Sequence, residues 1–235
     1  DFCDVKGKKK DKFKKSKNFI KNKFLVGSKI NFAENILSKK DNSKSITFLS
    51  ENGFRKEISW KVLNKDVRRI INFFKSIGIN ENDRVAAYLP NLIETVECFI
   101  ATSAIGAIWS SCSPDFGTNG VIERFSQINP KILIISDRYY YNGKEINVID
   151  RLPEIIKKIK SIKNVLVISY PGKKILKFNK VKKIKYFTWK NIVSSKPNEI
   201  KFKRFDFDKE LAILYSSGTT GKPKCICHRA GGVLL

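Results

Sequence analysis

Residues 84–111, RVAAYLPNLIETVECFIATSAIGAIWSS, decide the fold that this sequence predicts. The first six, 84–89, are mostly apolar and predict a buried strand. Pro90 and Asn91 then open a helix that runs to about residue 104, and residues 107–111 form a second predicted strand. A strand, a helix and another strand in close succession are typical of a parallel sheet covered by helices.

The same alternation continues along the chain. Further helices are predicted over residues 119–128, ended by Pro130, and over residues 148–160. Further strands are predicted over residues 131–136 and 164–169, both β-branched and almost continuously apolar. The sequence therefore predicts an α/β fold, a parallel sheet with flanking helices on both sides.

Two unusual segments follow strands of this predicted sheet. SSCSPDFG, residues 110–117, follows the second strand, and DRYYYNGK, residues 137–144, follows the third. Ligands of open α/β sheets bind at the carboxyl ends of the strands, so both segments are candidates for a binding site.

Regions on either side of this core are also patterned. Residues 46–60 predict two short strands around an Asn52-Gly53 turn. Ser59 then precedes a helix that Gly78 ends. Its apolar face holds Leu63, Val67, Ile70, Ile71, Phe74 and Ile77. Residues 171–204 are basic and weakly patterned, which predicts a connecting hairpin and surface loops, and residues 211–217 and 224–228 predict two more strands.

Charge and cysteine content bound the class of protein. The chain has 47 Lys and Arg against 22 Asp and Glu, a formal net charge of +25 that would suit nucleic acid or an anionic membrane. The cations are mostly lysine in a composition rich in Lys, Ile and Asn throughout, so we expect neither a nucleic-acid nor a membrane partner. Residues 6–23 predict a solvated arm or a surface helix. Five cysteines without disulfide spacing predict a cytoplasmic protein.

The stretch LYSSGTTGKPKCICH, residues 214–228, has the composition of a phosphate-binding loop. It is not a Walker loop, because Gly218 and Gly221 are only three residues apart and Pro223 stands where a Ser or Thr should follow the Lys. Its hydroxyls, glycines and lysines suit a polyphosphate held between two strands. Composition alone is equally compatible with a surface turn.

The string YSSGTTGKPK, residues 215–224, resembles the signature phosphate loop of the adenylate-forming superfamily. The resemblance implies that the β- and γ-phosphates of ATP are held by Ser217, Gly218, Thr219, Thr220, Gly221, Lys222 and Lys224. It also implies catalytic roles for Lys224, Thr219 and Thr220, with Lys224 countering the charge of the departing pyrophosphate.

Five segments narrow the resemblance to the acetoacetyl-CoA synthetase family. They are residues 30–37, 83–117, 124–134, 141–146 and 215–232. The resemblance implies an ATP-dependent ligase that uses ATP, Mg²⁺ and CoA and converts acetoacetate to acetoacetyl-CoA. An acetyl- or other short-chain acyl-CoA synthetase is the alternative, and a basic nucleic-acid-binding module is an alternative of another class.

The resemblance also implies two groups of CoA-binding residues. Asn142, Gly143 and Lys144 align with a region that binds the nucleotide end of CoA, although an Arg typical of relatives is replaced here, and a capped surface turn is the other interpretation. Asp115, Phe116 and Gly117 resemble the lining of the pantetheine path. The other interpretation of this segment is a structural turn with a buried Phe116.

The resemblance implies a division into a leading segment, residues 1–33, and an AMP-binding domain, residues 34–235. Relatives continue far beyond Leu235, and the sequence contains no Met, so we expect a fragment without ligase turnover of its own. We predict no metal site, because Cys225, Cys227 and His228 lack a second ligand pair. Cys112 is expected to be a buried, inert thiol.

Overall fold

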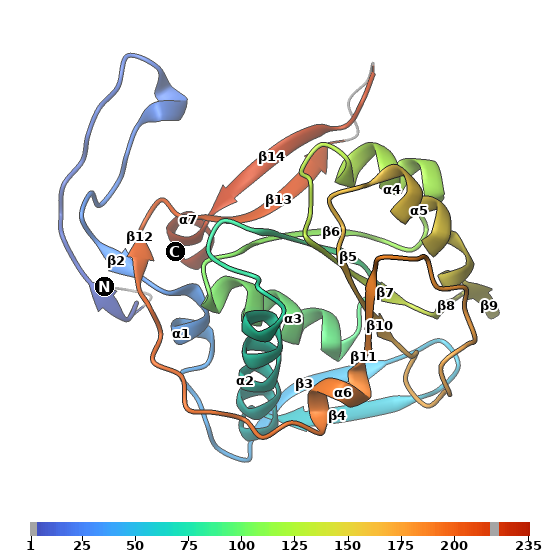
Figure 1. The fold of residues 1–235 in the computed structure, drawn as a ribbon. Coiled ribbons are helices and arrows are strands. Elements are labelled where there is room, and N and C mark those ends of the chain that lie inside the picture. Colours follow the sequence, from blue (N-terminus) through green and yellow to red (C-terminus); the bar gives the residue numbers. More distant parts are fainter. Residues whose placement is uncertain (1–3, 217–220) are drawn as a thin grey trace.

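The computed structural model, which describes residues 4–216 and 221–235, is built around a seven-stranded sheet (Figure 1). The strand order is β11-β10-β7-β5-β6-β13-β14. The strands are β5 (Arg84–Tyr88), β6 (Ile108–Cys112), β7 (Ile132–Ser136), β10 (Asn164–Ile168), β11 (Lys185–Thr188), β13 (Glu210–Ser216) and β14 (Lys224–Arg229). Neighbouring strands run parallel except for β14, which pairs antiparallel with β13. The predicted α/β fold is confirmed.

Helices cover the sheet on both faces. The parallel strands β7 and β10 are therefore buried along their whole length and have no polar face. Four helices pack together on one side, α1 (Phe32–Ile36), α2 (Trp60–Ser76), α3 (Ile93–Ala104) and α6 (Trp189–Val193). On the other side lie α4 (Thr118–Phe125) and α5 (Leu152–Lys158), the latter preceded by the 3-10 turn η2 (Ile149–Arg151) (Figure 1). The last helix is α7 (Ala230–Leu234).

Helix α2 begins and ends where the sequence predicts. The Ser59 side chain accepts a hydrogen bond from the backbone N–H of Val62 at 3.3 Å, which caps the helix. Its predicted apolar face is buried, with Ile77 half-buried at the end of the helix. Gly78 follows with φ +77, a conformation that glycine adopts without a steric penalty.

The predicted hairpin before α2 is present but its loop is longer than a two-residue turn. Strands β3 (Lys44–Leu49) and β4 (Arg55–Ser59) pair antiparallel. The five residues 50–54 connect the strands, and the backbone N–H of Ser50 donates to the carbonyl of Phe54 at 3.0 Å. Gly53 within this loop has φ +79. Phe48 packs edge-on against Tyr170, which attaches the hairpin to the core.

The structure of residues 171–204 differs from the sequence prediction of a connecting hairpin and surface loops. They contain no hairpin; instead β11 extends the sheet parallel to β10, and α6 follows it and packs against α2. Strand β11 is an edge strand with only partly buried side chains, so its local pattern is weak and its pairing is decided by tertiary contacts. A second hairpin, β8 (Arg138–Tyr141) and β9 (Lys144–Asn147), was also not predicted as strands.

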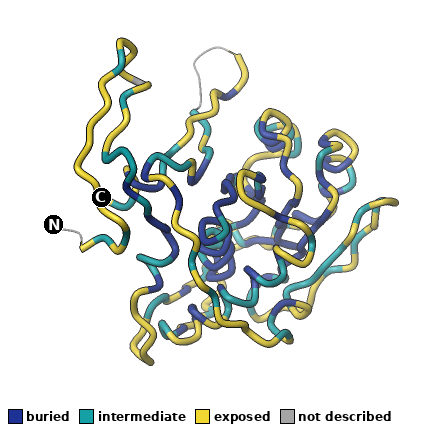
Figure 2. The backbone as a smooth tube through the Cα atoms, turned by 60° about the vertical axis from the view of Figure 1, so that its left-hand side comes forward, coloured by how far each residue is buried: buried dark blue, intermediate teal, exposed yellow. Residues whose placement is uncertain are grey.

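The leading residues form an exposed arm and a small sheet. Strands β1 (Gly7–Lys8) and β12 (Phe205–Asp206) both pair with β2 (Lys29–Ile30). Between β1 and β2 the chain extends outward around the 3-10 turn η1 (Phe19–Lys21) (Figures 1 and 2). The predicted domain boundary after residue 33 stays a prediction. In the described ranges, no helix is both long and apolar enough to cross a bilayer.

Candidate functional site

The two ends of the predicted phosphate loop leave the sheet side by side. Ser216, the last residue of β13, pairs with Lys224, the first residue of β14. Gly221 has φ +94, in the left-handed region that glycine favours. Lys222 and Lys224 are exposed, whereas Pro223 between them is buried. The other predicted loop residues, Ser217, Gly218, Thr219 and Thr220, lie outside the described residues.

Gln127 ties the second arm of this loop to the turn that follows α4. Its Nε2 donates to the carbonyl of Pro223 at 3.0 Å, and the Cys225 thiol donates to its Oε1 at 3.7 Å. No pattern in the sequence pointed to Gln127, because the contact joins residues 96 positions apart. Lys224 lies between the two anchored residues, so its backbone is fixed while its side chain is exposed.

Tyr215 anchors the first arm of the loop. The Ser110 hydroxyl lies 3.1 Å from the Tyr215 hydroxyl and donates to the carbonyl of Ile213 at 2.9 Å. The Tyr215 ring packs against that of Phe125 on α4. Burial raises the pKa of Tyr215 above its usual value, so the hydroxyl stays protonated at neutral pH. Both arms of the loop therefore rest on α4 and the turn after it.

The turn after β6 is held by two side chains that the sequence did not single out. The Tyr88 hydroxyl donates to the carbonyls of Pro114 at 3.1 Å and Phe116 at 2.5 Å. Arg151 Nη1 donates to the same carbonyls at 2.9 and 3.3 Å and to the Tyr88 oxygen. A guanidinium that satisfies several carbonyls at once fixes the turn at the carboxyl end of the strand.

Phe116 is not buried, in contrast to the interpretation of this segment as a structural turn with a buried Phe116. It is 40% exposed, and the Arg124 guanidinium lies over its ring at 4.0 Å from the centroid. The same guanidinium is 5.9 Å from the centroid of Tyr215 and donates to the carbonyl of Gly120 at 2.8 Å. Arg124 thus lies between the predicted pantetheine turn and the strand that leads into the phosphate loop.

The predicted CoA residues fall into two places. Asp115, Phe116 and Gly117 lie together, and Gly117 is the N-cap residue of α4. Asn142 and Gly143, at φ +50 and +71, form the tip of the β8–β9 hairpin, with Lys144 exposed as the first residue of β9. The backbone N–H of Gly143 donates to Glu51 Oε2 at 3.2 Å, so the tip lies against the β3–β4 loop.

Contacts at the base of the β8–β9 hairpin link it to the turn after β6. Burial raises the pKa of Tyr139, and a hydrogen bond with the Asp115 carboxylate raises it further. Asp137, directly before β8, is buried and accepts hydrogen bonds from the backbone N–H groups of Tyr170 at 2.9 Å and Leu176 at 3.0 Å. The hairpin therefore has a rigid base beside Asp115, with Lys144 near its far end.

The Cys112 thiol and the possible metal ligands are the remaining groups for which the sequence makes a prediction. Burial raises the pKa of Cys112 to about 12, which confirms the prediction of a buried thiol. Within residues 4–216 and 221–235, no group of three or more His, Cys, Asp or Glu side chains could hold a metal ion.

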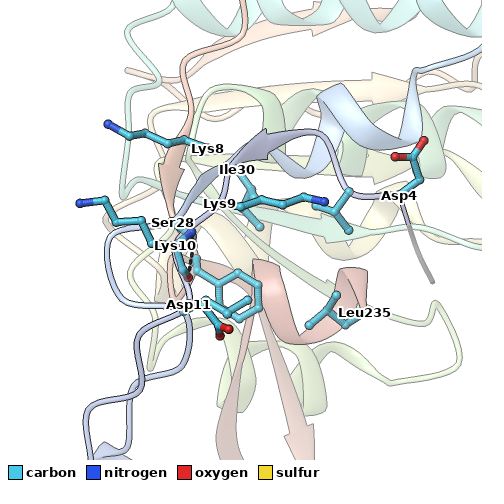
Figure 3. A pocket seen from close by; sticks show the side chains of 11 residues that line it. Asp4, Lys8, Lys9, Lys10, Asp11, Ser28, Ile30 and Leu235 are labelled. Carbon is cyan, nitrogen blue, oxygen red and sulfur yellow. Dashed lines mark hydrogen bonds between the residues drawn. The ribbon is translucent and has the colours of Figure 1, made fainter. Parts of the chain in front are cut away.

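A cavity of about 520 Å³ lies away from this site, at the base of the N-terminal arm (Figure 3). Its floor is apolar, with Leu25, Ile30 and Phe207, and its rim carries Lys8, Lys9 and Lys10. Among the described residues, none that lines this cavity belongs to the predicted phosphate loop or to the turn after β6. This cavity is thus not where the sequence places the chemistry.

Comparisons with known proteins agree with this geometry. A family model described as "AMP-binding enzyme" matches residues 37–234. The chain is 40% identical to an acetoacetyl-CoA synthetase of Xenopus tropicalis over 90% of its own length and 32% of that protein. It is 34% identical to the malonamoyl-CoA synthetase vrtB of Penicillium aethiopicum over 89% of its length and 30% of that protein.

A solved structure extends the likeness to three dimensions. The chain matches the acetoacetyl-CoA synthetase of Streptomyces lividans with a TM-score of 0.87 at 28% identity, over 99% of this chain and 35% of that one. The chain spans about a third of the length of the relatives that it matches.

Proposed function

Because the chain belongs to the family of AMP-binding enzymes, we propose that the whole protein is an AMP-forming acid–thiol ligase that joins acetoacetate to CoA. The observation that carries the proposal is the 40% identity to an acetoacetyl-CoA synthetase over 90% of the chain. The chain supplies the phosphate loop and part of the CoA path, so it contributes to both halves of the reaction.

The proposed reaction has two steps. A carboxylate oxygen of acetoacetate attacks the α-phosphorus of ATP, the bond to the bridging oxygen breaks, and pyrophosphate leaves. The CoA thiolate then attacks the acyl carbon of the adenylate, and AMP leaves with the bonding electrons. No protein nucleophile is needed, so the chain acts by positioning its substrates and stabilising charge.

We assign the first step to the phosphate loop, residues 217–224. The exposed side chains of Lys222 and Lys224 provide cations for the β- and γ-phosphates. The anchoring of Pro223 and Cys225 by Gln127 supports a fixed position for the Lys224 backbone between them. Ser217, Gly218, Thr219 and Thr220 are proposed to complete the loop, with Thr219 and Thr220 assisting Lys224 in catalysis.

Mg²⁺ enters this proposal as part of the substrate, MgATP. The described part of the chain offers no cluster of ligands for a resident ion. Bound to the phosphate oxygens of ATP, Mg²⁺ would neutralise charge that Lys222 and Lys224 would also offset.

We assign CoA to the carboxyl ends of β6 and β7. Asp115, Phe116 and Gly117 would line the path of the pantetheine arm, and Asn142, Gly143 and Lys144 would meet the nucleotide end. The exposure of Phe116 and of Lys144 supports these roles. Four described cysteines that are free support the reducing cytoplasm as the place of this reaction.

A second candidate substrate has its own support. Malonamate, which the fungal relative is named for, has an amide where acetoacetate has a methyl ketone, so the two acids have the same chain length and a carbonyl at the same carbon. The proposed substrate class is therefore a short 3-oxo carboxylate, with acetoacetate favoured by the higher identity.

An assay of the whole protein tests the proposal. Acetoacetate, malonamate, acetate and propionate are compared by pyrophosphate release and by mass spectrometry of the CoA thioester. We expect kcat/KM for acetoacetate to exceed that for acetate by about tenfold or more, the range that one recognised polar group provides. A preference for acetate would show that acetate, not acetoacetate, is the substrate. The absence of AMP with every acid would refute the proposed ligase activity.

A further inference from the structure

A strongly basic arm, residues 6–24, lies outside the proposed function. It holds ten lysines and one aspartate, a formal charge of +9 on 19 residues of a chain whose net charge is +25. Across residues 4–216 and 221–235, none of the lysines from Lys12 to Lys23 forms a salt bridge. The charge of the lysines from Lys12 to Lys23 is therefore available to a partner.

The basic arm has a defined backbone. Lys14 and Lys23 exchange two backbone hydrogen bonds, at 2.9 and 3.0 Å, and the N–H of Val26 donates to the carbonyl of Lys12 at 2.7 Å. Ser28 closes the base, because its hydroxyl accepts from the N–H of Lys10 at 2.7 Å and donates to the carbonyl of Lys10 at 2.9 Å. The arm doubles back on itself and extends away from the sheet (Figures 1 and 2).

Three phenylalanines on this arm face solvent. Phe19, in the 3-10 turn η1, is 81% exposed. Phe13 and Phe24 pack against each other on the two sides of the loop, with ring centroids 5.1 Å apart and the rings tilted by 43°. Each is about half exposed, at 52% and 53%. Exposed aromatic rings grouped with cations on one projecting loop mark an interaction surface.

We propose that the basic arm binds the surface of an anionic lipid bilayer. Lysines near such a surface are attracted to the negative head groups, and their long apolar stems can lie along it. Phe19, Phe13 and Phe24 would enter the boundary between head groups and acyl chains, as apolar residues of interfacial segments do. No membrane-spanning helix is required for this mode of attachment.

This inference departs from the expectation, drawn from the sequence, that the chain has no membrane partner. The sequence predicts a solvated arm or a surface helix over residues 6–23, and the fold shows that the phenylalanines of the arm are exposed as well as its lysines. Nucleic acid fits the arm less well, because the arm has no arginine for bidentate phosphate contacts.

Vesicle co-sedimentation of the 235-residue chain tests the proposal. Vesicles of phosphatidylcholine alone are compared with vesicles that also contain phosphatidylserine. We expect binding to the anionic vesicles only, decreasing as salt is added because part of the attraction is screened. Equal binding to both kinds of vesicle, or to neither, would overturn the proposal.

A charge variant with a matched control locates the surface. Lys14→Gln, Lys15→Gln and Lys17→Gln together are expected to weaken binding on the order of 100-fold, since each lysine contributes roughly a factor of five. Lys157→Gln, Lys158→Gln and Lys160→Gln, which change three exposed lysines in and just after α5, remove the same charge far from the arm in sequence. An equal loss in both triple variants would mean that total charge, not the arm, attracts the vesicles.

An aromatic variant separates a membrane from RNA. Phe19→Ser is expected to weaken vesicle binding about tenfold, while Leu49→Ser, which removes an exposed apolar residue of β3, leaves it unchanged. Single-stranded RNA is added as a competitor. RNA that displaces the vesicles and whose own binding depends on Phe19 would assign the arm to nucleic acid instead.

Discussion

The Gln127 side chain donates a hydrogen bond to the carbonyl of Pro223 at 3.0 Å, which joins the end of helix α4 to the second arm of the phosphate loop. The same helix begins at Thr118, directly after Gly117 of the predicted pantetheine turn. The two proposed half-reactions thus share one short helix as support. A substitution at one end of α4 should therefore affect mainly one half-reaction, and a substitution at the other end mainly the other. Separate rate measurements of the two half-reactions distinguish them.

Gln127→Leu is expected to loosen the attachment of the phosphate loop to the turn after α4 without unfolding the protein. The variant loses the bond to Pro223 and the contact with Cys225, about 1 kcal/mol, so KM for ATP should rise about fivefold in the whole protein. Thioester formation from presynthesised adenylate should be unchanged. Ser126→Ala, at the exposed neighbouring residue, is the control. Equal losses in both half-reactions would show that Gln127 has only a general structural role.

Lys224→Ala should affect the first half-reaction far more than the second. Its ammonium is proposed to offset the charge of the departing pyrophosphate, and loss of such a group commonly lowers the rate by about 10² to 10³. The measurement is ATP–pyrophosphate exchange, compared with thioester formation from presynthesised adenylate. Lys190→Ala, an exposed lysine of α6, is the control. Similar slowing of both steps would argue against this role.

Arg151→Lys should loosen the turn after β6 and raise KM for CoA about tenfold. Lysine presents a single ammonium where the guanidinium holds the carbonyls of Pro114 and Phe116 together. Tyr88→Phe removes the second donor to the same carbonyls, so the two changes should be non-additive in a double-mutant cycle. ATP–pyrophosphate exchange should stay normal, as it should for the exposed control Arg55→Lys. Strict additivity would contradict a shared role.

Thiol reactivity should divide the cysteines by burial. Burial raises the pKa of Cys112 to about 12 and that of Cys98 well above its usual value, so both stay protonated near neutral pH. Alkylation of Cys112 should be about a thousandfold slower than that of the exposed Cys225, because the thiolate is the reactive form. Mass spectrometry after iodoacetamide treatment measures the alkylation rate of each cysteine, with the denatured chain as control. Rapid labelling of Cys112 in the folded chain would contradict its burial.

Glu97 should make the fold less stable as the pH rises. Burial, and then the charges of Asp66 and Glu94, raise the pKa of its carboxyl well above the usual value, against the opposing effect of Lys56. The folded chain therefore holds a proton that the unfolded chain releases. The stabilisation is complete below the unfolded pKa and is lost as the pH rises towards the folded one.

Glu97→Gln should remove this dependence. Between about pH 5 and pH 8, the parent chain should lose more unfolding free energy than the variant. Urea unfolding at the two pH values measures the difference. Glu154→Gln, at an exposed position of α5, should behave like the parent. Parallel pH profiles for parent and Glu97→Gln would show that this carboxyl is not the titrating group.

The layered fold was predictable because its signals are local. The apolar runs of β5 and β7, the cap at Ser59 and the glycine at position 78 each depend on residues within a few positions of each other. The exception, β11, is an edge strand with half-exposed side chains, so its parallel pairing with β10 depends on packing that no local pattern specifies.

The sequence by itself determined the α/β fold, and its resemblance to known enzymes suggested the chemistry of the loop, since both rest on short runs of residues. The tertiary structure decided what holds that chemistry in place. Gln127 meets Pro223 across 96 positions, and Arg151 meets Pro114 across 37. It also decided that Phe19 faces solvent. Such contacts arise only when packing brings distant segments together, and burial depends on which surfaces that packing covers.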